Sequence, residues 1–429
     1  MEKTTTLKVS EVIFREDLYP RLEPDSKLIQ KYAEDLDVLP PIEVNQNRIL
    51  IDGFHRWTAH KKMEKEEIEV TITETKSEEE IFELAIERNS KFGLQMSQTD
   101  KKKACIRLYK DGTGKKKDDI SRLLSISLRT VNNHLSNVDK QLKEERDKKI
   151  KSMWFACYTQ EEIATELNEP RQTIARDIDS LPILENFPKW AKILAEFDDQ
   201  DENDENKFQV PIYNLWNFGK LTNGTSHFGN SEQRILENLL YLYTQPFDIV
   251  VDPFAGGGST IDVCKKRLRR YWTSDRKPIV EREKEIRLLD AIRNPIPLNN
   301  RWSEVSLTYL DPPYWKQAEG KYSQDPDDLA NMNLKDFTVN LSGFINEIGK
   351  KQSKGVIAML MQPTQWNSPN KEVVDHITDI ISHVDLPVKY RVSVPYSTEQ
   401  YTPQMVNWAK ENKELLVLTR ELVIWRIKK

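Results

Sequence analysis

The chain has only three cysteines and no long apolar run among its 429 residues. Cys105, Cys157 and Cys264 lie far apart and without CxxC spacing, which excludes a disulfide scaffold and a cysteine-built zinc site. A membrane span needs about 18 consecutive apolar residues, and no stretch approaches that length. The first residues also lack the apolar, positively flanked segment of a signal or transit peptide. We therefore expect a cytoplasmic protein without membrane contact and without a bound metal.

Charge is unevenly distributed along a chain whose net charge is only -5. Residues 91–151 contain 17 Lys or Arg and 8 Asp or Glu, which favours contact with nucleic acid. Residues 196–206 contain seven acidic residues and no basic one, a composition that cannot bury apolar surface. We therefore expect an acidic linker over 183–207, with separate domains on either side.

The first 92 residues alternate short β-rich runs with helical patterns, which predicts a small α+β domain. Its most informative stretch follows a strand at 49–51, where Gly53 precedes a helix with His55 and Arg56 in its first turn. Backbone NH groups at such a turn, with a nearby arginine, can bind phosphate. The alternative is structural, with Asp52 capping the helix and His55 and Arg56 forming a local ion pair.

This segment resembles the ParB/sulfiredoxin-type N-terminal domain, together with the runs around Pro20-Arg21, 39–42 and 85–89. In ParB partition proteins the corresponding box reads Gly-Glu-Arg-Arg and binds a cytidine nucleotide. Gly53 and Arg56 match that box, whereas Phe54 and His55 differ. The resemblance implies CTP or another nucleotide as a ligand of Gly53, His55 and Arg56. Sulfiredoxin activity is excluded because it needs a cysteine at this turn.

The region 93–182 contains a repeat with a constant offset of 43 residues. Five positions in the first copy (Ile120, Leu124, Thr130, Val131, Leu135) recur in the second (Ile163, Leu167, Thr173, Ile174, Ile178). Each copy pairs a short helix (118–124; 161–167) with a second helix that starts near Ser127 or Pro170. This is the helix-turn-helix pattern, whose second helix enters the major groove of DNA.

Side chains at the start of each second helix are the candidates for contact with double-stranded DNA. They are Arg129, Asn132 and Asn133 in the first copy, and Arg171, Gln172 and Arg176 in the second. Arginine can pair with guanine, and asparagine or glutamine with adenine. Lysines at 101–103 and 115–117 would add phosphate contacts that do not depend on sequence. A plain helical bundle with a solvated basic face is the alternative.

The second half of the chain carries two motifs at the ends of expected strands. The first, DPFAGGGST at 252–260, follows an apolar strand and opens a helix, as in nucleotide-binding α/β units. The spacing excludes the dinucleotide fingerprint GxGxxG, and no phosphate-binding GxxxxGK[ST] is present. The next strand ends in Asp275, where an acid can bind both hydroxyls of a ribose. The second motif, DPPY at 311–314, follows another buried strand.

Both motifs in one α/β frame resemble motifs I and IV of the S-adenosylmethionine-dependent DNA amino-methyltransferases. The stretches 227–240 and 421–425 are similar to their motif X and terminal strand. The resemblance implies an α/β Rossmann-like domain with a mostly parallel sheet over 208–429 and S-adenosylmethionine as cofactor. It makes Asp311, Pro312, Pro313 and Tyr314 the catalytic candidates. The cofactor-binding candidates are Asp252, Pro253, Phe254, Ala255, Gly256, Gly258, Ser259, Thr260 and Asp275.

These residue types suit transfer of a methyl group to an exocyclic amine. The amine is a poor nucleophile because its lone pair is conjugated with the ring, and hydrogen bonds to Asp311 and the Pro312 carbonyl would favour a pyramidal nitrogen. Tyr314 offers a face on which a flipped base can stack. Methylation of cytosine C5 needs a cysteine after a proline, and none of the three cysteines follows one.

The leading hypothesis is a multidomain adenine N6 DNA methyltransferase whose N-terminal regions select the DNA. Aspartate at the first position of the second motif is typical of adenine enzymes. Cytosine N4 methylation by the same site is the nearest alternative. A ParB-type partition or regulatory DNA-binding protein with an inactive methyltransferase domain is a rival of another class, and a homodimer is a further assembly to test.

Overall fold

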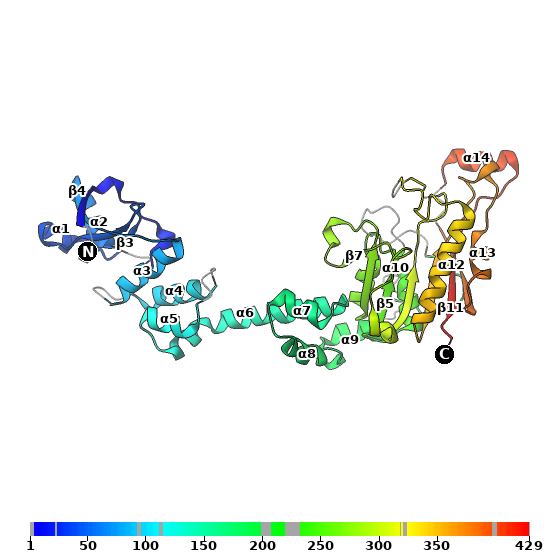
Figure 1. Cartoon of the computed structure of the whole chain (residues 1–429), viewed down its shortest axis with the longest axis horizontal. Coiled ribbons are helices and arrows are strands. Elements are labelled where there is room, and N and C mark those ends of the chain that lie inside the picture. The colour runs from blue at the N-terminus through cyan, green and yellow to red at the C-terminus, as the bar shows by residue number, and fades with distance from the viewer. Residues whose placement is uncertain are drawn as a thin grey trace. The chain divides into compact units, whose positions relative to one another are not determined.

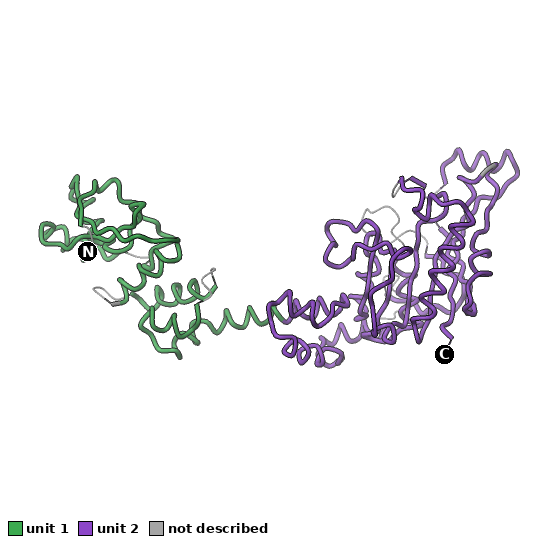
Figure 2. Tube along the Cα trace, viewed as in Figure 1, with its two compact units in different colours: residues 1–146 green, residues 147–429 purple. Residues whose placement is uncertain are grey.

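The computed structural model describes residues 4–21, 24–91, 96–110, 115–198, 207–218, 232–317, 319–320, 324–396 and 401–428. Contacts divide the chain into two compact units, residues 1–146 and residues 147–429 (Figure 2). The division falls inside one 28-residue helix, α6 (Leu128–Phe155). The two copies of the repeat, expected in one region over 93–182, therefore belong to different units. The boundaries expected at residues 92 and 208 stay predictions.

The first unit begins with a four-stranded sheet in the order β1-β4-β2-β3 (Figure 1). The strands are β1 (Thr4–Lys8), β2 (Ile42–Asn45), β3 (Leu50–Asp52) and β4 (Glu67–Thr73). Within the described residues of this sheet, β2 and β4 pair in parallel and the other two pairs are antiparallel. The accompanying helices are α1 (Ser26–Glu34), α2 (Phe54–Lys62) and α3 (Glu78–Lys91). This arrangement confirms the expected α+β fold.

The first unit continues as helices packed around their own core. The helices are α4 (Gln98–Lys110), α5 (Lys117–Leu124) and the first part of α6. Their core joins α3 through buried apolar residues at Phe82, Ile86, Cys105, Leu108, Ile120, Leu124, Val131 and Leu135. All four apolar positions of the repeat's first copy are thus buried here, which is why that spacing specifies a helix pair.

The second copy of the repeat forms α7 (Gln160–Leu167) and α8 (Arg171–Asp179). Its turn has the same backbone as the first copy, because Ser125 and Asn168, 43 residues apart, both take the left-handed conformation. The hydrogen bonds of the turn also correspond, from Ile126 N to Ser121 O at 3.1 Å and from Glu169 N to Ala164 O at 2.9 Å. The predicted duplication is confirmed at the level of the backbone.

The segment expected to be an acidic linker is in part a packed helix, α9 (Lys189–Glu196). Ala191, Ala195 and Phe197 are buried, and Phe197 lies under the guanidinium of Arg267 at 4.3 Å. Arg267 Nη1 also donates to Leu194 O at 3.0 Å. The linker was expected from the acidic run at 196–206, which follows the apolar face of α9 and does not include most of it. Residues 199–206 lie outside the described residues.

The second unit is built on a seven-stranded sheet in the order β10-β11-β9-β8-β5-β6-β7. The strands are β5 (Ile249–Asp252), β6 (Arg270–Asp275), β7 (Ile286–Leu288), β8 (Val305–Leu310), β9 (Val356–Met361), β10 (Val388–Pro395) and β11 (Thr419–Arg426). Neighbours from β9 to β7 pair in parallel, and β11 is antiparallel to both β9 and β10. The expected mostly parallel α/β fold is confirmed.

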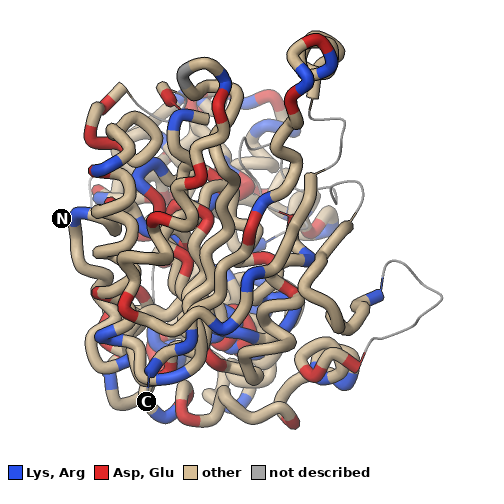
Figure 3. Tube along the Cα trace, turned by 90° about the vertical axis from the view of Figure 1, so that its right-hand side faces the viewer, with Lys and Arg blue, Asp and Glu red and all other residues tan. Residues whose placement is uncertain are grey.

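Two apolar clusters cover the two faces of this sheet, because successive strand residues such as Val250 and Val251 point to opposite sides. The helices around the sheet are α10 (Gln233–Tyr243), α11 (Ser259–Lys266), α12 (Leu334–Lys351), α13 (His376–Ser382) and α14 (Pro403–Asn412). α10 and α11 contribute to one cluster, and α12 and α13 to the other. Figure 3 shows charged residues of both signs mixed around the strands. None of the helices in the described ranges combines the length and apolarity that a membrane crossing requires.

Candidate active site

The candidate site lies where the strand order of the sheet changes direction, between β5 and β8. The chain moves from β5 outward to β6 on one side and later to β8 and β9 on the other. Ligands of such sheets bind at the carboxyl ends of the strands at this switch point. Asp252, Asp275 and Asp311 end or follow β5, β6 and β8. Asp252 interacts electrostatically with the other two, so the structure brings the three predicted acids together.

Asp252 braces the glycine-rich turn from inside. Its side chain is buried, and it accepts hydrogen bonds from Thr260 Oγ1 at 2.5 Å and from Phe254 N at 3.0 Å. Burial, with smaller contributions from Asp311 and Asp275, raises the pKa of Asp252 to about 7. Both Asp252 and Thr260 were predicted as cofactor-binding residues, and their bonds indicate that they act by shaping the turn.

Gly258 precedes α11 in a left-handed conformation, with φ of +82°. A Cβ atom there would lie 2.8 Å from Cδ of Arg282, so a side chain would collide as well as strain the backbone. Arg282 is itself fixed by Asp262 on α11, with both carboxylate oxygens 2.8 Å from Nη2. The glycine therefore allows close packing between the start of α11 and the segment after β6.

Asp275 lies at the edge of the turn and is half-buried. It accepts from Gly256 N at 3.0 Å and from Lys277 N at 2.8 Å, one bond to each carboxylate oxygen. A carboxylate has about four acceptor positions, so these two bonds leave capacity for the two hydroxyls of a ribose. The donor and acceptor set of this edge therefore fits the nucleoside part of S-adenosylmethionine.

The DPPY motif follows β8 directly. Tyr314 is half-buried, and its hydroxyl donates to Asp311 Oδ1 at 3.2 Å. Burial and the nearby Asp311 carboxylate hold the pKa of Tyr314 well above its usual value, so its hydroxyl stays protonated. Trp315 O then accepts from Thr364 Oγ1 at 2.6 Å, which fixes the end of the motif to the segment after β9.

Two residues near Asp311 were missed by sequence reasoning, Tyr396 after β10 and Arg420 on β11. The Arg420 guanidinium lies over the Tyr396 ring at 3.9 Å, and both residues interact electrostatically with Tyr314 and Asp311. Both come from the antiparallel hairpin at the far end of the sheet, more than 80 residues along the chain from Asp311. The available signal was an arginine near the start of an apolar strand, which by itself indicates no function.

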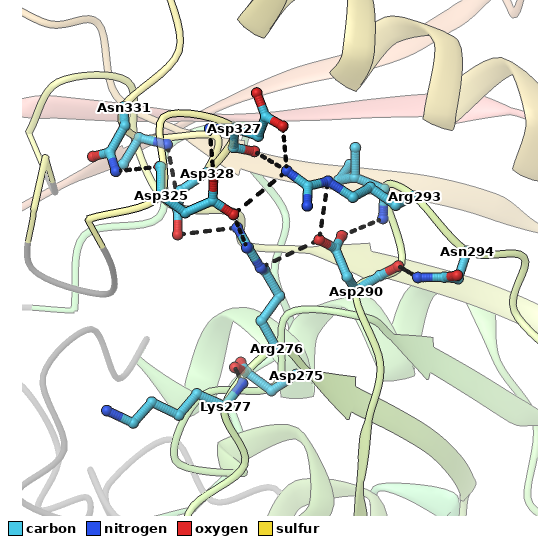
Figure 4. A network of polar contacts seen from close by, with 12 residues as sticks. Asp275, Arg276, Lys277, Asp290, Arg293, Asn294, Asp325, Asp327, Asp328 and Asn331 are labelled. Atoms are coloured by element: carbon cyan, nitrogen blue, oxygen red, sulfur yellow. Dashed lines mark hydrogen bonds and ion pairs between the residues drawn. The ribbon is translucent and has the colours of Figure 1, made fainter.

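A network of ion pairs connects the cofactor edge with the segment that follows the catalytic motif (Figure 4). Arg276, next to Asp275, contacts Asp290 at 3.2 Å, Asp325 at 2.9 Å and Asp328 at 3.2 Å. Arg293 contacts two of these aspartates, Asp290 at 3.6 Å and Asp325 at 3.5 Å, and also contacts Asp327 at 3.0 Å.

The same segment, residues 324–332, reaches back to the end of the motif. Lys316 N donates to Ala330 O at 3.1 Å, and Trp315 Nε1 donates to Met332 O at 2.9 Å. The cofactor edge at Asp275 and the DPPY motif are therefore connected by one continuous set of contacts. His, Cys, Asp and Glu side chains of the described residues form no group of three that could hold a metal ion.

The N-terminal box differs from the structural alternative, in which Asp52 caps the helix and His55 pairs with Arg56. Gly53 has φ of +99°, and a Cβ there would lie 2.6 Å from Ile42. Arg56 pairs with Asp52 at 2.8 Å, not with His55. His55 Nε2 accepts from Asp25 N at 2.9 Å, and burial together with Arg21 lowers the pKa of His55. Gly53, and no side-chain cap, begins the helix.

The six candidate DNA contacts are all exposed on the second helices of the two copies. Their pairing differs, because Arg171 Nε lies 2.8 Å from Glu161, whereas no ion pair of the described residues involves Arg129. Among the predicted phosphate contacts, Lys115 pairs with Glu83 and Lys117 with Asp139, each at 2.6 Å. Residues 227–231 of the motif X-like stretch lie outside the described residues.

Residues 56–280, more than half of the chain, match the family model described as DNA methylase, whose name refers to N6 and N4 methyl transfer. The matched range includes the turn at 252–260 and ends before the DPPY motif. No curated protein matches the chain.

Several solved structures are similar to parts of the chain. Chromosome-partitioning protein ParB from Caulobacter crescentus, complexed to the centromeric parS site, is 15% identical, with 33% of this chain and 79% of that chain covered and a TM-score of 0.25. A Pnob8-like ParB N-domain is 16% identical, with 46% and 89% covered and a TM-score of 0.24. Precorrin-6y C5,15-methyltransferase from Geobacter metallireducens is 14% identical, with 49% and 95% covered and a TM-score of 0.27.

Proposed function

This chain belongs to the DNA methylase family, and we propose that it transfers a methyl group from S-adenosylmethionine to the N6 amino group of adenine in double-stranded DNA. The observation that carries the proposal is the placement of Asp311, held by Tyr314, beside the turn that follows β5. An amine bound at Asp311 would therefore face a ligand bound at that turn. Aspartate at this position favours adenine over cytosine N4, which is the alternative acceptor.

The cofactor supplies an electrophilic methyl group on sulfur, and we propose that this chain's residues bind and orient both partners. The backbone of 253–258 and the Asp275 carboxylate would hold the cofactor. Asp311 and the Pro312 carbonyl would accept hydrogen bonds from the target amine and direct its lone pair. Holding two reactants in the correct geometry can supply much of the rate enhancement.

We propose that DNA is contacted by the exposed second helices of the two repeat copies, with the more basic first copy contributing more. Residues 115–137 carry five Lys or Arg against two Asp or Glu, which favours binding to phosphates. We also propose that the box at Gly53, His55 and Arg56 binds CTP, supported by the buried Nε atoms of Arg21 and Arg56, which lack a partner among the described residues. A homodimer stays a prediction, which a molecular-mass measurement in solution tests.

The test is methyl transfer from labelled S-adenosylmethionine to duplex DNA, followed by identification of the modified base. Asp311→Ala should reduce transfer below a tenth of the wild-type rate while DNA affinity stays within about twofold, because the proposed DNA contacts lie elsewhere. Asp379→Ala, an exposed acid on α13, is the matched control and should transfer normally. An inactive wild-type chain would support the regulatory DNA-binding rival, and N4-methylcytosine in the product would support the cytosine alternative.

A further inference from the structure

Arg420 is a buried cation beside the catalytic motif. It lies on β11 opposite Val394 of β10, and only 3% of its surface is exposed. The residues that follow it in the strand, from Leu422 to Trp425, are apolar and fully buried. Burial of a charged group is costly unless it is paired and hydrogen-bonded. An arginine at this position therefore requires an explanation beyond packing.

Arg420 begins a chain of contacts that ends on Asp311. Its guanidinium carbon lies 3.9 Å from the centre of the Tyr396 ring, so the cation stacks on the face of that ring. Tyr396 interacts in turn with Tyr314, whose hydroxyl donates to Asp311 Oδ1 at 3.2 Å.

The contacts leave part of the guanidinium unused. Its buried Nε has no hydrogen-bond partner in the described part of the chain. Arg420 also interacts electrostatically with Asp311, Tyr314 and Tyr309, so its charge acts on the whole motif. A buried donor without a partner, on a residue whose charge acts on a catalytic motif, indicates a role in the site, because such groups are otherwise satisfied.

We propose that Arg420 and Tyr396 are positioning residues that hold the Asp311 carboxylate ionised and in one orientation for the target amine. This inference rests on the proposed methyl transfer. The ionised carboxylate suits this role, because both of its oxygens accept hydrogen bonds, whereas a protonated carboxyl presents an O–H donor on one of them. The hydrogen bond from the Tyr314 hydroxyl to Oδ1 restrains rotation of the carboxylate, and Tyr396 supports Tyr314 from the side of β10.

Arg420 from β11 is the cation that acts on Asp311 and favours its charged form, and Asp252 from β5 opposes that form when ionised. The Tyr314 hydroxyl donates to the Asp311 carboxylate, and Tyr396 after β10 also interacts with it. Tyr309 on β8 acts on Tyr314 and Arg420. Removal of a nearby opposite charge raises the pKa of a carboxyl by about 1 to 3 units.

The experiment compares Arg420→Met, Arg420→Lys and Tyr396→Phe with wild type, measuring kcat, KM for DNA and cofactor affinity between pH 5.5 and 9. Arg420→Met should lower kcat about tenfold or more. It should also shift the acidic limb of the pH profile of kcat, where activity falls as pH is lowered, to higher pH by about 1 pH unit or more. Cofactor affinity should stay within about twofold of wild type. Arg420→Lys should keep the acidic limb of the pH profile at its wild-type position and should have a higher kcat than Arg420→Met. Tyr396→Phe should lower kcat with a smaller change in the limb.

The matched control is Arg391→Met, which removes an exposed arginine of the same hairpin that pairs with Glu421. It should leave both kcat and the limb unchanged. An Arg420→Met enzyme with the wild-type limb would overturn the inference, as would an Arg420→Lys enzyme no better than Arg420→Met. If Arg420→Met binds no cofactor and is therefore misfolded, Arg420→Lys and Tyr396→Phe decide the question by their kcat and by the acidic limb of its pH profile. A wild-type chain that transfers no methyl group would instead refute the proposed function.

Discussion

The first repeat copy, in α5 and the start of α6, and the second copy, in α7 and α8, share a backbone but differ in charge. Ile120 and Ile163 are fully buried at equivalent positions, and Ser125 and Asn168 make the same turn. Residues 115–137 carry five basic and two acidic residues, whereas residues 158–180 carry two basic and six acidic ones. The buried spacing maintains the backbone, and the exposed positions between are free to change charge.

The surroundings of the two copies differ as well. The first packs against α3 and α4 in the N-terminal unit. The second is fixed to the catalytic sheet, because Trp154 just before it contacts Phe247, with ring centres 5.8 Å apart, and Arg287 Nη2 donates to Ala156 O at 2.9 Å. We infer that the two copies contribute unequally to the proposed DNA binding, and that the second copy also serves as part of the catalytic unit.

The largest expected effect is on stability. Ile120→Ala and Ile163→Ala should each lower the free energy of unfolding of their own unit by about 2 to 5 kcal/mol, because each leaves a cavity in a packed core. Calorimetry with and without S-adenosylmethionine identifies the catalytic unit by its ligand-sensitive transition. Only Ile163→Ala should lower that transition. Ile183→Ala, which removes a 44% exposed side chain, is the control, and a ligand-sensitive transition lowered by Ile120→Ala would contradict the assignment of the copies.

A smaller effect is expected on DNA affinity. Arg129→Ala should raise the Kd for duplex DNA about 5-fold to 150-fold, equivalent to about 1 to 3 kcal/mol, if Arg129 contacts a base. Arg171→Ala should raise it less than about threefold, because Arg171 already pairs with Glu161 in acidic surroundings. Arg122→Ala, on the first helix of the first copy, is the control for lost charge. Equal losses for Arg129→Ala and Arg171→Ala would show that both copies contact DNA, and a uniform loss across sequences would indicate a phosphate contact.

The smallest expected effect is stabilisation of one unit by its own ligand, CTP for the N-terminal unit and S-adenosylmethionine for the catalytic unit. CTP at about five times its Kd should stabilise the N-terminal unit by about 1 kcal/mol and leave the transition that responds to S-adenosylmethionine unchanged. Arg56→Ala should abolish the CTP response. The control is Arg48→Ala, which removes an exposed arginine paired with Glu11. A response retained by Arg56→Ala would remove this box from nucleotide binding.

Motifs that are continuous in sequence could be predicted with their positions in the fold. The turn at 252–260 and the DPPY motif at 311–314 each follow a strand, and a chain segment that leaves a parallel strand must lie at the carboxyl edge of the sheet. The helix pairs were predictable for a similar reason, since their apolar spacing is local. The α9 helix was not, because its short apolar face is adjacent to a strongly acidic run.

The sequence by itself determined the helix pairs of the repeat, the strands that carry the two motifs, and the candidate residues Asp252, Asp275 and Asp311. Only the tertiary structure decided which copy of the repeat joins the catalytic unit and that Arg420 lies beside Asp311. The physical reason is that strand order is set by packing across the whole sheet, which placed β11 next to β9 and its first residues at the carboxyl edge. A residue's partners across such a sheet are fixed by register between distant segments, which local spacing does not encode.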